Sequence, residues 1–306
     1  MNKFIRATVG VFAVLIFLSG CSVSGSNPAK DGDKIIKEGL DNFYDLTAAD
    51  FDGALKGVQK SSTGDTTFDI SFSGSGDIKD PKNILLNLKF DGSGALDKQS
   101  ENVSGEMKIN KSDLYFFVSK ISSFGGMISE DISKPLIKQW WKTQLPQDMV
   151  DSLKESAAFG DESKLTPEEK KSRELLKETQ FFSGAKYIGE ENGDYRYETT
   201  LDPEAVKTYV EKSAEIYGET TSEDQLKAID ENFKNTHVKA EFWVGATDKT
   251  VHKFNLNINV DDSVADIKMD ATLNFSVNNI DKPVTVEAPK DAKEFDPNVI
   301  FGGVTQ

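Results

Sequence analysis

The chain has few residues suited to redox or metal chemistry, with one cysteine and two histidines among 306 residues. A single cysteine excludes an intramolecular disulfide. After residue 20 no stretch is apolar over the length that a membrane-spanning helix requires. Cations are outnumbered, because 36 lysines and arginines accompany 51 aspartates and glutamates, which gives a net charge of −15. This charge repels nucleic acid, so we expect no nucleic-acid partner.

Motifs for catalysis and cofactor binding are also missing. The sequence contains no Gly-x-Ser-x-Gly elbow, phosphate-binding loop or dinucleotide fingerprint. His237 and His252 fall far apart on predicted strands, which argues against a shared metal site, and the acidic clusters lack the spacing of a calcium loop. We therefore expect no enzymatic activity, no cofactor and no bound metal.

The N-terminal residues have the features of an export signal. Residues 1–6 are basic, and residues 7–17 form an apolar run too short to span a bilayer. The run ends in Leu18-Ser19-Gly20-Cys21, which resembles the lipobox of bacterial lipoproteins. The alternative is an ordinary signal peptide with a cysteine at its end by chance.

The lipobox resemblance implies that residues 1–20 are a signal peptide and that Cys21 carries lipid, palmitate included. The protein would then be exported and anchored to the outer face of the cell membrane, or on the periplasmic side of the envelope. Several acyl chains hold a protein at a membrane essentially permanently. Residues 21–33, small and polar after the cysteine, then form a flexible tether, and residues 34–306 form a single domain.

The mature chain begins with helical periodicity and then changes to period two. Apolar spacing predicts one or two helices over residues 34–58, with Thr47 capping the second. Alternation of apolar and polar residues then predicts four antiparallel strands in meander order, over 67–73, 84–90, 103–109 and 114–118.

An apolar loop over residues 119–139 interrupts the strands before Trp140 and Trp141 resume them. Two glycines make this loop a candidate lid, and we predict that it gates a binding site through Phe124, Gly125, Gly126, Met127 and Ile128.

The C-terminal half predicts helices and a second set of strands. We expect helices over 148–159 and 166–179, a hairpin turn at 190–194, and helices capped by Asp202 and Ser222. Alternation is clearest in the last third, where the strands cover 238–244, 254–260 and 267–277. A sheet with one long apolar face must cover that face with something.

This order of elements resembles the LolA/LolB and LppX/LprG superfamily of bacterial lipid-binding proteins over nearly all of residues 34–296. The points of similarity are the segment 111–116, Trp141-Lys142, the Phe242-Trp243-Val244 strand with 250–254, and the closing segment 279–289. The resemblance implies an α+β fold, a curved antiparallel sheet forming an incomplete barrel, with helices covering or plugging its concave apolar face. It also implies a cavity for acyl chains.

Our leading hypothesis is a lipoprotein that binds a lipid or lipid-linked molecule and carries or presents it in the envelope. The predicted ligand-lining residues are Phe68, Ile70, Leu88, Phe90, Phe116, Phe242, Phe254, Leu256 and Ile258. In the first alternative, helices fill the apolar face and the protein is an envelope sensor or scaffold that binds a partner protein. The second alternative is a hydrolase whose site the sequence does not reveal.

Overall fold

The computed structural model describes residues 27–62, 64–80, 83–96, 99–122, 134–145, 165–262 and 266–296. The helices are α2 (Gly32–Tyr44), α5 (Pro167–Glu178), α6 (Pro203–Ile216) and α7 (Glu223–Lys234). The strands are β1 (Ala48–Ser61), β2 (Gly64–Asp77), β3 (Leu85–Leu96), β4 (Gln99–Asn110), β5 (Asp113–Ile121), β6 (Trp140–Gln144), β7 (Phe182–Glu191), β8 (Asp194–Leu201), β9 (Thr236–Gly245), β10 (Val251–Asp262), β11 (Ile267–Asn278) and β12 (Lys293–Glu294).

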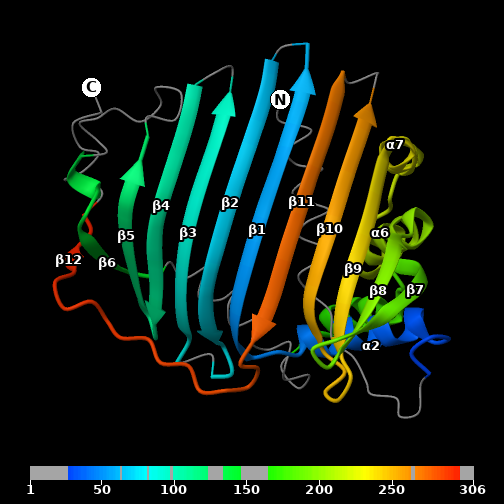
Figure 1. Ribbon diagram of the computed structural model, residues 1–306, viewed down its shortest axis with the longest axis horizontal. Helices are drawn as coiled ribbons and strands as arrows, with labels where there is room; N and C mark the ends of the chain where they lie inside the picture. Colours follow the sequence, from blue (N-terminus) through cyan, green and yellow to red (C-terminus); the bar gives the residue numbers. More distant parts are fainter. Residues whose placement is uncertain are drawn as a thin grey trace. The chain divides into compact units, whose positions relative to one another are not determined.

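The strands are hydrogen-bonded in the order β12-β6-β5-β4-β3-β2-β1-β11-β10-β9-β8-β7 (Figure 1). The sheet is antiparallel apart from β12, which runs parallel to β6. It is open, because β12 and β7 are edge strands. The predicted α+β fold with an unclosed antiparallel sheet is confirmed.

The chain divides into two compact units, each described separately below. Unit 1 comprises the chain up to Leu46 together with Asp161–Ile258. Unit 2 comprises Thr47–Gly160 together with the chain from Asn259 onward, so β10 contributes residues to both. The single domain predicted over residues 34–306 stays a prediction.

The predicted meander is confirmed in unit 2. Strands β2 to β5 follow one another in sequence and in space, and each pairs antiparallel with the next. The strand resumed at Trp140 is β6, which pairs with β5. The regular alternation of apolar and polar side chains is what specifies this register, since a shift of one residue would turn every apolar side chain to the other face.

The helix predicted over the second part of residues 34–58 is wrong, because residues 48–61 form β1. This strand pairs with both β2 and β11. Gly53 and Gly57 explain the difference, since each glycine inside a helix costs about 1 kcal/mol relative to alanine. In β1 they alternate with charged residues such as Asp52 and Lys56, and two neighbouring strands satisfy the backbone.

The first predicted helix is α2, which covers the apolar side of the sheet in unit 1. Ile35 and Ile36 are almost completely buried, as are Val244 of β9 and Val251 of β10. Gly39 permits the close approach, since a Cβ there would lie 2.7 Å from Cγ1 of Val244. The helix begins at Gly32, inside the stretch 21–33 predicted as a tether, and residues 28–30 form a turn ahead of it.

The cap signals for α5, α6 and α7 are confirmed. Thr166 and Glu169 form a reciprocal capping box at the start of α5. Asp202 caps α6 by accepting from two backbone N–H groups, and Ser222 forms a second capping box with Gln225 at α7. The predicted helix over 148–159 lies outside the described residues.

Replacing Thr166 with alanine is expected to destabilise the protein by about 1 kcal/mol, because the Glu169 N–H loses its acceptor. Denaturant unfolding of the two proteins checks this value. Thr166→Ser keeps the hydroxyl and is the matched control, and an equal loss in both variants would contradict the capping account.

Candidate functional site

One face of the sheet in unit 2 is apolar across six neighbouring strands, as the pairing register shows. Phe72 of β2 lies opposite Gly53 of β1 and Phe90 of β3, and Leu88 lies opposite Met107. Residues directly opposite in antiparallel strands share a face. The apolar face, so defined, comprises Phe51, Leu55, Phe68, Ile70, Phe72, Leu86, Leu88, Phe90, Val103, Met107, Leu114, Phe116, Val118, Leu273 and Phe275.

The opposite face of the same strands is mostly polar, although it includes Tyr115 and Phe117 of β5. It carries residues such as Asp52, Asp69 and Lys89, and Lys56 of β1 forms an ion pair with Asp69 of β2 at 2.9 Å. Five predicted lining residues, Phe68, Ile70, Leu88, Phe90 and Phe116, lie on the apolar face. The structure brings these five together, and their contact with a ligand stays a prediction.

Aromatic rings on the apolar face lie over glycines of the neighbouring strands. A Cβ added to Gly53 would overlap the ring of Phe72, and a Cβ added to Gly57 would overlap the ring of Phe68. Gly105 has the same relation to Phe90, whose Cζ would lie 2.7 Å from the added Cβ. The rings therefore lie along the sheet, over the neighbouring strands.

The apolar face is closed at one end and more exposed toward the other. A buried cluster of Ile84, Ile109 and Leu145 packs with Leu86 and Leu114 at the closed end. Nearby, Phe295 contacts the rings of Phe116 and Trp141, with centroids 5.1 and 6.0 Å away.

Toward the other end Ile70 is 41% exposed. The first charged residue on the face at this end is Glu101 of β4. It lies opposite Gly94 of β3, which in turn lies opposite Phe68. Its carboxylate accepts a hydrogen bond from Ser122 Oγ at 2.6 Å. A carboxylate and a hydroxyl group therefore lie at the exposed end of the apolar face.

The other four predicted lining residues belong to unit 1 and form its core with α2. Phe242 and Leu256 are each 2% exposed. Phe254 contacts Phe242 and Phe43 of α2, with both ring centroids 6.2 Å away. Ile258 is half-buried. The apolar side of the sheet in unit 1 is therefore filled by the protein itself.

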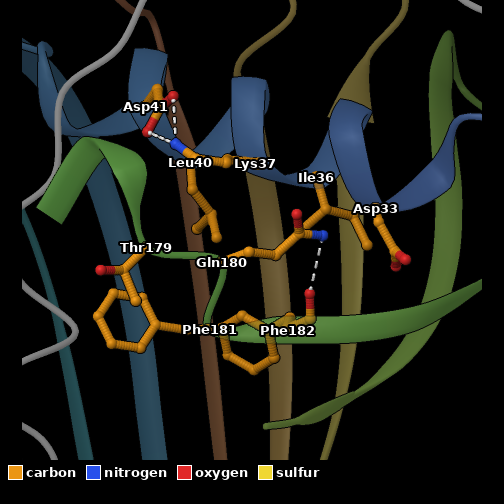
Figure 2. Close-up of a pocket in the computed structure, with 9 residues that line it drawn as sticks. All are labelled: Asp33, Ile36, Lys37, Leu40, Asp41, Thr179, Gln180, Phe181 and Phe182. Atoms are coloured by element: carbon orange, nitrogen blue, oxygen red, sulfur yellow. Dashed lines mark hydrogen bonds and ion pairs between the residues drawn. The ribbon is translucent and has the colours of Figure 1, made fainter. Parts of the chain in front are cut away.

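A small cleft remains in unit 1 between α2 and the segment that connects α5 to β7 (Figure 2). Its volume is about 270 Å³, open solvent included, which is below the usual size of a ligand pocket. Lys37 donates to both oxygens of Asp41 at 3.1 and 2.9 Å along its rim. Burial raises the pKa of Asp41, and Lys37 acts in the opposite direction. The lining residues are Asp33, Ile36, Lys37, Leu40, Asp41, Thr179, Gln180, Phe181 and Phe182.

His252 joins two turns of unit 1. Its Nδ1 lies 2.9 Å from Asp194 Oδ1, and its Nε2 lies 2.8 Å from Asp248 Oδ2. Only the protonated imidazole donates from both nitrogens. Burial lowers the pKa of His252, but Asp248 and Asp194 outweigh burial and raise the pKa above its ordinary value of 6.5. Among the described residues no group of three or more His, Cys, Asp or Glu is placed to hold a metal.

The contribution of His252 to stability is expected to depend on pH. Because the pKa is raised on folding, the stabilisation is complete below pH 6.5 and is lost as the pH rises through the folded-state pKa. We expect the wild type to exceed His252→Gln in unfolding free energy at acidic pH and to lose that advantage at alkaline pH. Denaturant unfolding across this range is the measurement, with His237→Gln as the control for an exposed histidine. A difference independent of pH would refute the account.

The ligand-lining residues predicted from the sequence do not include several residues of the apolar face. The omitted residues include Phe51 and Leu55 of β1 and Phe275 of β11, which the register places beside Phe72 and Ile70. The signal for β1 is the period-two order of Phe51, Gly53, Leu55 and Gly57. Its two glycines have no side chain to mark the apolar face, so the alternation is weak.

Two further predictions concern residues outside the described ranges. They are lipid attachment at Cys21 and the gate at Phe124, Gly125, Gly126, Met127 and Ile128. Within the described part of the chain, no helix has the length and apolar character needed to cross a membrane.

Neither a protein-family model nor a curated protein sequence matches the chain. Among solved structures it is similar to a beta-barrel-like protein of the domain of unknown function DUF1849 from Brucella abortus, at 10% identity and a TM-score of 0.25, covering 76% of this chain and 100% of that one. It is also similar to a DUF1329 family protein from Desulfovibrio piger ATCC 29098, at 10% identity and a TM-score of 0.19, covering 86% and 96%. Both scores are too low to support an argument about the site.

Proposed function

We propose that the protein is a membrane-anchored lipoprotein that binds a lipid or lipid-linked molecule on the apolar face of unit 2. The observation that carries the proposal is the apolar face itself, whose side chains stay half-exposed over neighbouring strands. Contiguous apolar side chains that stay half-exposed are typical of a binding surface. Binding serves carriage or presentation of the lipid in the cell envelope, without catalysis.

The chemistry of the face suits an acyl chain. Each methylene that the face removes from water contributes about 0.8 kcal/mol, so a chain needs no charged partner along its length. In the proposal the chain lies across the rings of Phe68, Phe72 and Phe90, which themselves lie along the sheet. A polar head group then belongs at the exposed end, near Glu101 and Ser122.

The anchor supports the same function from the sequence. In the proposal the apolar run 7–17 directs export, and lipid on Cys21 holds the protein at the membrane. A lipid ligand is then within reach of the face without free diffusion of the protein.

A second candidate is an envelope sensor or scaffold that binds a partner protein. It is favoured by unit 1, where α2 fills the apolar side of the sheet and the cleft of Figure 2 is small. In this alternative the apolar face of unit 2 docks a protein surface instead of a lipid.

The two functions are separated by titrating the delipidated mature chain with a fluorescent fatty acid in detergent-free buffer. The lipid-binding proposal predicts saturable uptake with a stoichiometry near one per chain, reversed by unlabelled fatty acid. Absence of uptake would count against lipid binding. Recovery of one stoichiometric protein partner from crosslinked envelopes, without lipid, would then favour the scaffold.

A further inference from the structure

The second half of the stretch predicted as a tether, from Pro28 onward, is fixed on unit 1. The hydroxyl of Tyr197, a side chain with 0% exposure, donates to the carbonyl oxygen of Pro28 at 3.2 Å. Asp33 Oδ1 accepts from the N–H of Ala185 at 2.6 Å. The N–H of Asn27 donates to Asp31 Oδ2, also at 2.6 Å. The chain is thus held to β8 at Pro28 and to β7 at Asp33, and Asn27 is tied to Asp31 within the same turn.

This attachment shortens the tether. A fully extended chain spans at most about 3.3 to 3.6 Å per residue, so the six steps from Cys21 to Asn27 reach about 20 Å. A lipid anchor on Cys21 would therefore keep the surface around Pro28 within about 20 Å of the bilayer surface. The longer flexible tether predicted over 21–33 would have allowed the domain to turn freely.

The lysines around Pro28 are more exposed to solvent than the neighbouring aspartates. Lys30, Lys34 and Lys186 are exposed, whereas Asp31 and Asp33 are half-buried and accept backbone hydrogen bonds. Glu198 lies across from Lys186 in the register of β7 and β8, so Lys30 and Lys34 carry most of the positive potential. Three lysines therefore accompany three carboxylates here, so this surface carries no local excess of negative charge in a chain whose net charge is −15.

We propose that the surface formed by residues 28–34 and Lys186 faces the bilayer and that its lysines contact anionic lipid head groups. This inference rests on the lipid anchor of the proposed function. It adds the orientation of the protein on the bilayer. The short connection to Cys21 keeps this surface near the membrane, and the exposed lysines contact the head groups.

The test uses the mature chain, whose only cysteine is Cys21. Its thiol is coupled to a maleimide lipid in vesicles of phosphatidylcholine with phosphatidylglycerol, so the result does not depend on lipidation by a host. Lysines are then acetylated with a water-soluble reagent, and the modification of each is quantified by mass spectrometry against the uncoupled chain. Lys227 and Lys234 of α7 are internal controls. This helix ends just before β9 begins at Thr236. Thr236 lies about 20 Å along β9 from Phe242, the residue that is paired with Tyr197.

We expect acetylation of Lys30, Lys34 and Lys186 to fall several-fold on coupling, while Lys227 and Lys234 change little. Insertion of about 20 Gly and Ser residues between Ser24 and Gly25 lengthens the tether and should restore acetylation. Unchanged acetylation of Lys30 and Lys34, or equal protection of the α7 lysines, would overturn the proposed orientation. The fatty-acid titration is independent of this test, so failure of the orientation is distinguishable from failure of the lipid-binding function.

Discussion

Leu88→Asp is expected to abolish binding of a fluorescent fatty acid while leaving the protein folded. Leu88 lies in the middle of the apolar face, between Gly74 of β2 and Met107 of β4. A carboxylate there would have to lose its water as the acyl chain docks, which costs several kcal/mol. Since about 1.4 kcal/mol is a tenfold change in Kd, the affinity should fall by at least tenfold.

The matched control is Thr67→Asp, which also adds one negative charge to the same sheet. Thr67 is exposed on the opposite face, with the uncharged Val58 and Ala95 as its neighbours in register. Circular dichroism establishes that both variants are folded, and fluorescence titration gives their affinities. Equal binding by Leu88→Asp and the wild type would show that the apolar face is not the lipid site.

The double variant Gly53→Val/Gly57→Val is expected to destabilise the protein by about 1 to 3 kcal/mol for each substitution. The added side chains would occupy the positions of the Phe72 and Phe68 rings, which lie over these glycines. The rings must then lift from the sheet or the strands must shift. Chemical denaturation measures the loss, and acyl-chain affinity should fall with it because the lifted rings fill the space above the face.

A rescue experiment separates ring displacement from a general intolerance of β1 to valine. In Phe72→Ala the space over Gly53 is vacated, so adding Gly53→Val to Phe72→Ala should cost less than Gly53→Val alone. Ala54→Val, on the opposite face of β1, should change the unfolding free energy by no more than about 0.5 kcal/mol. Equal costs of Gly53→Val with and without Phe72 would contradict the proposed packing.

Local signals in the sequence predicted most of the secondary structure. The caps at Thr166, Asp202 and Ser222 mark three helices correctly, because each satisfies backbone N–H groups within its own turn. The strands of the meander were equally readable from period two. Strand β1 was not, since Gly53 and Gly57 stand where apolar side chains would have shown the alternation.

The site depended on tertiary packing that no local pattern encodes. Phe90 and Phe242 both follow a charged residue in a strand, yet Phe242 is buried in the core that α2 completes and Phe90 stays half-exposed on the apolar face. The contact of His252 with Asp248 spans four residues, whereas Asp194 comes from a distant hairpin. Which helix covers which strands is decided by the whole chain, so the sequence predicted an apolar face but not which part of it is filled.

Native mass spectrometry of the mature chain shows whether unit 2 holds a lipid. The mature chain, with Cys21 replaced by serine and exported under a leader that adds no lipid, is purified without detergent and examined before and after organic extraction. The account predicts a non-covalent adduct near one per chain that extraction removes and identifies as a lipid. A protein that emerges without adduct and also takes up no fatty acid would contradict it.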